Sequence, residues 1–280
     1  MPEGPEIRRE ADRLARVLVD APLERVWFRF PRLQARAGEL SARRVVAVHA
    51  RGKALLTEFD DGRAIYSHNQ LYGRWYLVRT GVEPATRRDL RLALEPATHR
   101  ALLYSASEIE ILEAGAWHAH PFLARLGPDV FDAGTTPAFL RRRMRERPFL
   151  RRPLGRLLMD QSFVAGLGNY LRTEILYAAR LHHALRPVDL AADELGELSR
   201  QIRRMARRAY ATKGETATRA FVRARRARGL PRRACRHWVF EREEEPCPAC
   251  GAPIRRETVD GRRLYLCPAC QPAPAARSAA

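Results

Sequence analysis

Two closely spaced cysteine pairs constrain the fold of this chain more than any other sequence feature. Cys247-Pro-Ala-Cys250 and Cys267-Pro-Ala-Cys270 are separated by sixteen residues. Two pairs at this distance are typical of a structural zinc site, in which four thiolates surround one ion. The alternative is two disulfides, which are rare in cytosolic proteins. We therefore expect one structural Zn²⁺, bound by Cys247, Cys250, Cys267 and Cys270.

The residues between the cysteine pairs favour a β-hairpin. The strand-like runs 254–259 and 262–266 flank Asp260-Gly261. An Asp-Gly pair between two strands predicts a tight two-residue turn. Because zinc would clamp the base of this hairpin, we expect Arg262 to be held at a rigid tip. The alternative is that Arg262 is one more exposed arginine, and we expect no special role for the fifth cysteine, Cys235.

The charge of the chain indicates a polyanionic partner. The formal net charge is +19, and the isoelectric point is close to 11.0. An excess of this size favours nucleic acid, with an anionic membrane surface as the weaker alternative. No apolar run approaches the ~18–20 residues of a membrane span, and the charged N-terminus lacks the apolar core of a signal peptide. We therefore expect a cytoplasmic protein.

The first part of the chain combines one helix with many short strands. The helix is expected after Pro5, because Ile7, Ala11, Leu14 and Leu18 follow at helical spacing. Strand-like runs broken by Gly, Pro and Asp then favour an antiparallel sandwich or barrel. We expect strands at 25–30, 45–48, 54–59, 63–67, 75–78, 90–94 and 101–104.

From Pro137 the hydrophobic pattern becomes helical, after a linker rich in Gly, Thr and Pro. Thr136 is the expected N-cap of the first helix. The arginine-rich stretch 219–236 contains Gly229 and Pro231 and predicts either a mobile lid over an acidic ligand or a solvated connector. Further helices are expected at 153–162, 169–179 and 190–210, and a loose tail at 272–280.

The segment Gly166-Leu167-Gly168-Asn169 opens one of these helices. Glycines before a helix allow backbone N–H groups to approach a phosphate, and the helix N-terminus favours an anion. Asn169 is a good N-cap and can also donate to phosphate. The alternative is a structural turn without a ligand.

The chain begins Met1-Pro2-Glu3, and this stretch can carry chemistry. Removal of Met1 before a small residue would leave Pro2 as a free secondary amine. An α-amino group has a pKa of about 7.7–8.0, so part of it is unprotonated near neutral pH. Such an amine can attack carbon and form an iminium ion, and Glu3 lies close enough for acid–base work. The alternative is a frayed terminus before a helix.

Lysine is almost absent from this basic chain. Only Lys53 and Lys213 occur, and arginine supplies the remaining basic side chains. A lysine can lose its proton, whereas an arginine effectively cannot. Lys53 is therefore a candidate functional residue. The alternative is that the two lysines have no special role and simply remain in a chain whose composition favours arginine.

Four features together resemble a known family. They are the terminal Pro2–Glu6, the segment Arg51–Leu56, the helix start Gly166–Asn169 and the four-cysteine hairpin. The chain resembles the bifunctional DNA glycosylases of the formamidopyrimidine-DNA glycosylase/endonuclease VIII family from residue 2 to about 271. It is most similar to the bacterial endonuclease VIII branch, because Gly4 replaces a leucine usual in the purine-specific branch and Tyr66–Gly73 looks like endonuclease VIII.

The resemblance implies an α+β multidomain fold. It predicts an N-terminal catalytic antiparallel β-sandwich with flanking helices, a helix-two-turns-helix DNA-binding domain and a zinc-finger β-hairpin. The expected boundaries are 1–128 for the sandwich, 129–136 for the linker, 137–234 for the helical domain, 235–271 for the zinc finger and 272–280 for the tail.

The resemblance also implies a covalent mechanism on a nucleotide flipped out of the duplex. Pro2 attacks C1′ and expels the base, while Glu3 handles protons at the sugar. The iminium acidifies the C2′ proton, and elimination cuts the strand. Lys53 serves the elimination steps and contacts phosphate, and Arg262 holds phosphate and assists the second elimination.

Five further residues are expected to bind DNA by the same resemblance. Gln70, Leu71 and Tyr72 would enter the gap that the flipped nucleotide leaves, since a polar, an apolar and an aromatic side chain suit a stacking wedge. The alternative for these three is a plain loop between strands. Arg125 and Asn169 match family positions that hold the DNA backbone.

The implied function is a β,δ-eliminating DNA glycosylase and AP lyase of base excision repair that removes oxidised pyrimidines from double-stranded DNA. One alternative is the same mechanism on oxidised purines, 8-oxoguanine or formamidopyrimidine, because in the purine branch a loop in the region that matches Tyr210 to Cys247 helps hold the flipped base. The other is a non-catalytic nucleic-acid-binding zinc protein, which would not need Pro2, Glu3 and Lys53. We expect a monomer in the bacterial cytoplasm, associated with the nucleoid and without a membrane partner.

Overall fold

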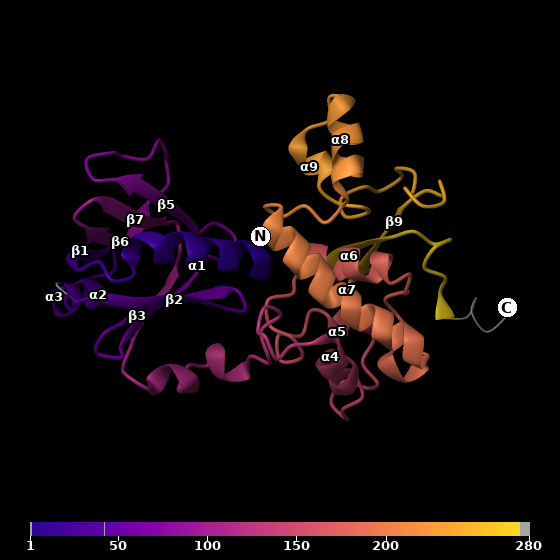
Figure 1. The fold of residues 1–280 in the computed structure, drawn as a ribbon, viewed down its shortest axis with the longest axis horizontal. Coiled ribbons are helices and arrows are strands. Elements are labelled where there is room, and N and C mark those ends of the chain that lie inside the picture. The colour runs from indigo at the N-terminus through magenta and orange to yellow at the C-terminus, as the bar shows by residue number, and fades with distance from the viewer. Residues whose placement is uncertain (1, 42, 275–280) are drawn as a thin grey trace. The chain divides into compact units, whose positions relative to one another are not determined.

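The computed structural model describes residues 2–41 and 43–274, which fall into two compact units divided between Arg125 and Leu126 (Figure 1). The first unit, coloured indigo to magenta, is mostly β, and the second, pink to yellow, is mostly helical. Each unit has its own hydrophobic core. No helix among the described residues is long and apolar enough to cross a membrane.

The first unit is a sandwich of two four-stranded antiparallel sheets. One sheet has the order β1-β6-β7-β5 and the other the order β2-β3-β4-β8. Their apolar side chains form one shared core, to which Phe28 and Leu94 contribute from the first sheet and Leu55 and Ile109 from the second. The strands are β1 (Leu23–Phe28), β2 (Val45–Arg51), β3 (Ala54–Phe59), β4 (Ala64–His68), β5 (Arg74–Arg79), β6 (Leu90–Pro96), β7 (His99–Tyr104) and β8 (Glu108–Leu112), and the short helices α2 (Pro31–Gln34) and α3 (Ala37–Leu40) connect β1 to β2.

Helix α1 (Gly4–Leu18) anchors the N-terminal residues to the sandwich by packing on β2. Pro5 occupies its first turn, where a backbone N–H is not required. The carboxylate of Glu6 accepts a hydrogen bond of 3.0 Å from the backbone N–H of Glu3, which satisfies a donor at the helix start. The apolar face buries Ile7, Ala11, Leu14 and Leu18.

The antiparallel sandwich expected from the strand pattern is confirmed. Strand β8 adds to the expected set, and its alternating Glu-Ile-Glu-Ile sequence is a usable strand signal. The 3₁₀ turns η1 (Ala116–Ala119) and η2 (Leu123–Arg125) follow it. Their apolar side chains pack on Ala54, Leu56 and Tyr66, so the second sheet has a second, smaller core.

Four helices build the core of the second unit. The expected cap is confirmed, because the Thr136 hydroxyl accepts a hydrogen bond of 3.1 Å from Phe139 N. The long helix buries Leu195, Leu198, Ile202 and Met205 along one face, at the spacing that the sequence shows. The helices are α4 (Pro137–Met144), α5 (Leu154–Leu157), α6 (Asn169–Ala178) and α7 (Ala192–Ala211).

The helix expected at 153–162 is wrong beyond its first turn. Helix α5 ends at Leu157, and a turn follows in which Asp160 Oδ1 accepts hydrogen bonds from the backbone N–H and the hydroxyl of Ser162. Short polar side chains compete with helix hydrogen bonds in this way. Gln161 then bonds to the backbone of Met159, Gly166 and Leu167, which fixes the loop before α6.

The segment 219–236 is helical, so the expectation of a loop or a solvated connector is wrong, and a lid over an acidic ligand stays a prediction. Helix α8 (Arg219–Ala227) and helix α9 (Arg232–Cys235) pack on each other. The Thr218 hydroxyl caps α8, and Val222 and Cys235 are buried in a small core of their own. At least one of the arginines supports the folded segment, because Arg225 forms an ion pair with Glu245 at 2.7 Å.

The four-cysteine segment forms the expected hairpin. Strands β9 (Arg255–Val259) and β10 (Arg262–Leu266) pair antiparallel, with Arg262 opposite Val259. Asp260 and Gly261 have φ of 49° and 72°, as a tight two-residue turn with both central residues left-handed requires. Arg262 is exposed at the first position after this turn.

A buried carboxylate joins α6 to the residues that precede the zinc-finger hairpin. Glu174 accepts hydrogen bonds from backbone N–H groups of residues 238, 239 and 240 at 2.7, 2.9 and 2.9 Å, and from the Thr216 hydroxyl at 2.6 Å. Burial raises the pKa of Glu174, and these four donors lower part of that rise. The donors replace the lost water, so the 238–240 backbone is fixed to α6.

We expect Glu174→Gln to lower the free energy of unfolding by about 2–4 kcal/mol, because the new amide nitrogen faces N–H donors that then lose their acceptor. Thermal or urea unfolding measures this loss. Glu241→Gln is the matched control, since Glu241 is exposed and its substitution should stay within about 0.5 kcal/mol of the unchanged protein. Equal losses in the two variants would contradict the role given to Glu174.

Candidate functional site

Pro2 lines a cavity of about 290 Å³ in the first unit. The walls come from the first turns of α1, from the loop Asn69–Gly73 and from the start of β5. Glu10 contributes a carboxyl whose pKa is raised by burial and lowered in part by Arg13. The cavity therefore combines the half-buried N-terminal proline with acidic, basic and apolar side chains.

Glu3 lies at the junction of Pro2 and helix α1, as the N-cap residue. Only 4 % of its surface is exposed. A carboxylate at a helix start is stabilised by the positive end of the helix. Glu3 is close to Pro2 because it is the next residue in the chain, and helix α1 fixes the orientation of Glu3.

The loop Asn69–Gly73 is held in one compact turn. Gly73 N donates to Asn69 O at 2.7 Å, and a Cβ on Gly73 would lie 2.6 Å from Asn69 Cα, so only glycine fits. Gln70 has a left-handed φ of 46°. Leu71 and Tyr72 are 59 % and 67 % exposed, an unusual position for large apolar side chains.

The side chain of Gln70 is bound to the start of β8 rather than extended into solvent. Ser107 Oγ donates to Gln70 Oε1 at 2.8 Å, and Gln70 Nε2 donates to Glu108. The backbone N–H of Gln70 donates to His68 Nδ1 at 3.1 Å. The loop thus presents Leu71 and Tyr72, while Gln70 braces it.

Lys53 lies in the two-residue turn between β2 and β3, where Arg51 pairs with Ala54. Gly52 has a φ of 59°, so the turn needs a residue that tolerates the left-handed region. Burial lowers the pKa of His68, Glu108 raises it, and the charge of Lys53 lowers it again. Ala54, the next residue after Lys53, pairs with His68, which directly precedes the loop Asn69–Gly73.

Arg125 is the last residue of the first unit and ends η2. Its guanidinium Nε donates to Pro121 O at 2.8 Å, and the side chain is exposed. Arg125 does not line the cavity that contains Pro2.

In the second unit, Asn169 connects α6 to the hairpin. Asn169 Nδ2 donates to Arg263 O at 2.8 Å, and Arg172 Nη2 donates to Asn169 Oδ1 at 2.5 Å. The expectation that Asn169 is the N-cap is wrong: Gly168 is the N-cap and Asn169 is the first helical residue, because its side chain bonds to β10 and Arg172 instead. Asn169 and Arg262 are therefore positioned by one connected network.

Four sulfur atoms meet at the base of the hairpin. The Sγ atoms of Cys247, Cys250, Cys267 and Cys270 all lie within 4.8 Å of one another. A tetrahedral zinc–thiolate site with Zn–S bonds of about 2.3 Å needs Sγ–Sγ distances of about 3.8 Å. The donor set and its spacing fit a zinc ion, and Cys235 is buried elsewhere, in the small core of α8 and α9.

Several residues of this framework were not expected from the sequence. Arg172, Glu174 and His68 hold the elements that carry the candidate residues through hydrogen bonds that are partly or fully buried. The sequence feature that could have identified two of them is the pair of charged residues Arg172 and Glu174, which lie in a helix without other charged residues. Glu10 and Arg88 also line the Pro2 cavity, and Arg88 donates to Tyr72 O at 2.7 Å.

Three family models match the chain. The N-terminal domain of formamidopyrimidine-DNA glycosylase matches residues 1–106, and the H2TH domain of the same enzyme matches residues 126–220. The zinc finger found in formamidopyrimidine-DNA glycosylase and isoleucyl-tRNA synthetase matches residues 244–273. These matches cover most of both units.

Relatives cover nearly the whole chain. Endonuclease 8 from Escherichia coli is 45% identical over 271 residues, which are 97% of this chain and 100% of the relative. Endonuclease 8 from Pectobacterium atrosepticum is 46% identical over the same share of each chain. The solved complex of Lactococcus lactis Fpg with abasic-site DNA has the same fold, with a TM-score of 0.79 at 20% identity over 97% of this chain and 100% of that one. The chain therefore belongs to the formamidopyrimidine-DNA glycosylase family, on the side of its endonuclease 8 members.

Proposed function

We propose that this chain is a bifunctional DNA glycosylase and AP lyase of base excision repair that removes oxidised pyrimidines. The observation that carries the proposal is the placement of Pro2 in a cavity beside the exposed Leu71 and Tyr72. A nucleophile beside an apolar wedge suits a reaction on a nucleotide that has left the duplex. The 45% identity to endonuclease 8 supports the same activity.

Pro2, freed by removal of Met1, is the proposed nucleophile; Met1 itself lies outside the described residues. Its nitrogen forms a bond to C1′ of the damaged nucleotide, the glycosidic bond breaks, and the base leaves with a proton. Opening of the sugar gives an iminium ion, which withdraws electrons from C2′. Loss of the C2′ proton expels the 3′ phosphate in β-elimination, and a second elimination expels the 5′ phosphate.

Glu3 and Lys53 are proposed to move protons in these steps. Glu3 is buried next to Pro2, so its carboxyl can serve the sugar oxygen without competition from bulk water. Lys53 carries an amine that can gain and lose a proton, and the next residue, Ala54, pairs with His68 at the edge of the loop Asn69–Gly73. We propose that Lys53 also binds the phosphate at the lesion.

The loop Asn69–Gly73 is the proposed wedge. Leu71 and Tyr72 expose apolar surface that a base stack would cover, and burying a leucine side chain contributes about 1.5–3 kcal/mol. Gln70 can join them if it exchanges Ser107 and Glu108 for a base edge. This loop would fill the gap in the helix and keep the nucleotide flipped out.

Damaged double-stranded DNA is the partner, and we propose that Arg125, Asn169 and Arg262 hold its backbone. Arg125 and Arg262 have exposed guanidinium groups, and Asn169 lies at the N-terminus of α6, where N–H groups favour phosphate. The net charge of +19 supports strong electrostatic binding. We further propose a monomer without a membrane partner, located in the bacterial cytoplasm at the nucleoid.

One structural zinc ion is proposed for the four cysteines. Four thiolates leave no open coordination position, so the ion would stiffen the hairpin and would not take part in the reaction. Arg262 then depends on zinc only for its position.

Removal of Met1 and use of Pro2 as nucleophile predict that borohydride traps a protein–DNA adduct on abasic-site DNA. Pro2→Gly should lose base excision by at least about a hundredfold, because a primary amine forms a less electrophilic adduct in a looser site. Glycosylase and trapping assays measure this. Pro84→Gly, in a loop that does not line the Pro2 cavity, is the matched control and should keep full activity. Undiminished excision by Pro2→Gly would refute the assignment.

Elemental analysis should find one zinc equivalent in the purified chain. Cys250→Ser should lose zinc and weaken DNA binding, because the hairpin that carries Arg262 loses its clamp. Cys235→Ala changes the one cysteine outside the cluster and should retain a full equivalent. Active protein without metal would contradict the structural zinc.

Thymine glycol should be excised faster than 8-oxoguanine opposite cytosine, by about tenfold or more in single-turnover experiments on one duplex context. Saturated pyrimidines stack poorly and therefore flip at lower cost, whereas 8-oxoguanine stacks well and needs a pocket for the flipped purine. Faster release of 8-oxoguanine would place the chain with the purine branch and make the segment α8–α9 the first candidate for base binding.

A further inference from the structure

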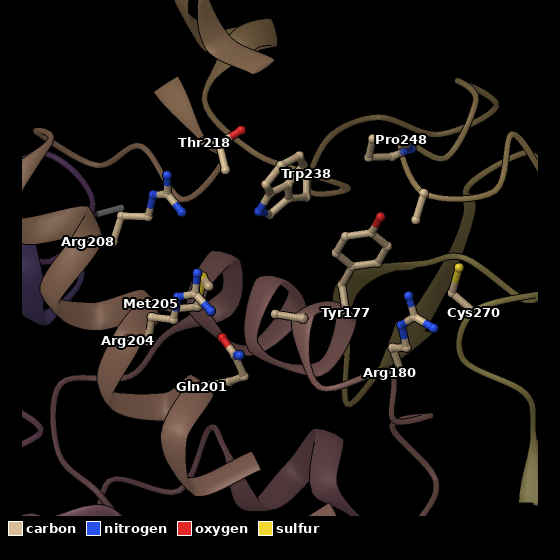
Figure 2. Close-up of a pocket in the computed structure, with 12 residues that line it drawn as sticks. Tyr177, Arg180, Gln201, Arg204, Met205, Arg208, Thr218, Trp238, Pro248 and Cys270 are labelled. Carbon is tan, nitrogen blue, oxygen red and sulfur yellow. The ribbon is translucent and has the colours of Figure 1, made fainter. Parts of the chain in front are cut away.

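A second cavity, of about 310 Å³, lies in the helical unit and has no part in the proposed excision site (Figure 2). It is bounded by the C-terminal end of α6, by the second half of α7 and by Pro248, Ala249 and Cys270 of the four-cysteine segment. Asn169 is at the opposite end of α6, about 12 Å away along a helix that rises 1.5 Å per residue. The cavity is therefore separate from the DNA-backbone contact proposed for Asn169.

The rim of this cavity is positively charged. Arg180, Arg204 and Arg208 line it, and the lining contains no acidic residue. None of the three guanidinium groups has an ion-pair partner among the described residues. The nearby carboxylates already bind other arginines, because Glu197 pairs with Arg200 at 2.7 Å and Glu215 pairs with Arg226 at 2.7 Å.

Arg208 is the most enclosed of the three arginines. Burial lowers its pKa, and the positive charges of Arg204 and Arg219 lower it further, against the opposite effect of Glu215. An anion beside Arg208 would offset both the burial and the repulsion. Arginine prefers phosphate or carboxylate as such an anion, since its planar fork can make two parallel hydrogen bonds.

A buried acceptor in the cavity wall also lacks a partner. Gln201 is 5 % exposed, and its Oε1 has no hydrogen-bond partner within the described chain. Its Nε2 donates to Glu197 Oε1 at 2.6 Å, and because a carboxylate only accepts, the amide cannot be flipped. Figure 2 shows the carboxamide directed towards Arg204. Because this oxygen is itself buried, Gln201 shapes the cavity wall and offers no acceptor to a ligand.

Aromatic side chains complete the cavity. Figure 2 shows Trp238 and Tyr177 between Arg208 and Arg180. The Trp238 ring packs on Phe221 with centroids 4.9 Å apart, and the Tyr177 hydroxyl contacts Cys247 Sγ at 3.4 Å. Both rings are therefore held in place before any ligand binds, and Met205 adds apolar surface beside them.

We propose that this cavity binds a nucleoside monophosphate group, either as a free nucleotide or as the terminal nucleotide of a single strand. The arginines hold the phosphate, and Trp238 and Tyr177 stack on the base. Phosphate at arginine and base on aromatic ring is the common pattern of single-strand recognition. The volume lies at the lower end of the range for ligand cavities, which suits one nucleotide rather than a peptide segment.

Calorimetric titration of the full chain with deoxyadenosine 5′-monophosphate tests the proposal. We expect one saturable site that Arg208→Gln weakens by about tenfold or more, because charge-assisted hydrogen bonds are lost. Trp238→Phe should keep most of the affinity and Trp238→Ala should lose it. Inorganic phosphate alone and deoxyadenosine alone should each bind at least about tenfold more weakly, since each makes only half of the contacts.

Arg207→Gln is the matched control, because Arg207 is exposed on the same helix and does not line the cavity. It makes the same charge change and should leave affinity within about twofold. Equal weakening by Arg207→Gln and Arg208→Gln, equal binding of phosphate and nucleotide, or no binding at all would overturn the proposal. Thermal melting checks that Arg208→Gln is folded.

The two sources of the ligand give different results. A 5′-phosphorylated single-stranded tetranucleotide that binds more tightly than the mononucleotide, with the same loss in Arg208→Gln, supports a strand end. Tighter binding of the mononucleotide supports a free nucleotide. Base excision by Arg208→Gln on thymine glycol duplexes should remain unchanged, so failure of this site and failure of the proposed glycosylase are distinguishable.

Discussion

The buried carboxylate of Glu174 is the interaction on which the second unit most depends. It lies on α6 and fixes the backbone of residues 238–240, which lead into the four-cysteine segment. Five residues earlier on the same helix, Asn169 binds the carbonyl of Arg263 on strand β10. One helix thus positions both the start of the zinc segment and its far hairpin. The residues proposed to hold DNA are placed by buried polar bonds and not by the hydrophobic core alone.

In the first unit, backbone geometry holds the candidate residues in place. The cavity at Pro2 exists because α1 is fixed by its apolar face and because Gly73 closes the loop against Asn69. Around this frame, Ser107, Glu108 and Arg88 bond to the loop from outside. Polar groups hold the frame, so that apolar Leu71 and Tyr72 can remain exposed.

Local signals in the sequence predicted most of the elements. The cysteine spacing and Asp260-Gly261 predicted the hairpin, and hydrophobic periodicity predicted α1 and α7. The helices of 219–236 were not predicted, because nearly half of the residues there are arginine and the small core of Val222 and Cys235 forms only in three dimensions. The turn after α5 depends on side-chain bonds of Asp160 and Gln161, which periodicity does not register.

The candidate site was predictable by residue type and not by arrangement. Resemblance identified Pro2, Lys53 and the loop at Gln70, but the proximity of Pro2 to this loop depends on contacts between residues about seventy positions apart. The same applies to Glu174, whose backbone partners lie 64 to 66 residues further along the chain. Contacts at such separation follow from the topology of the sandwich and of the helical unit.

The bracing of the loop Asn69–Gly73 also has an entropic consequence for recognition of DNA. Fixing the backbone of a flexible residue costs about 1–2 kcal/mol, so ordering this five-residue loop only on binding would oppose association by several kcal/mol. Here the turn at Gly73 and the bonds of Gln70 order the loop in the free protein. For the wedge role proposed above, a loop whose backbone is already ordered in the free protein meets the DNA without the entropic cost of a folding step.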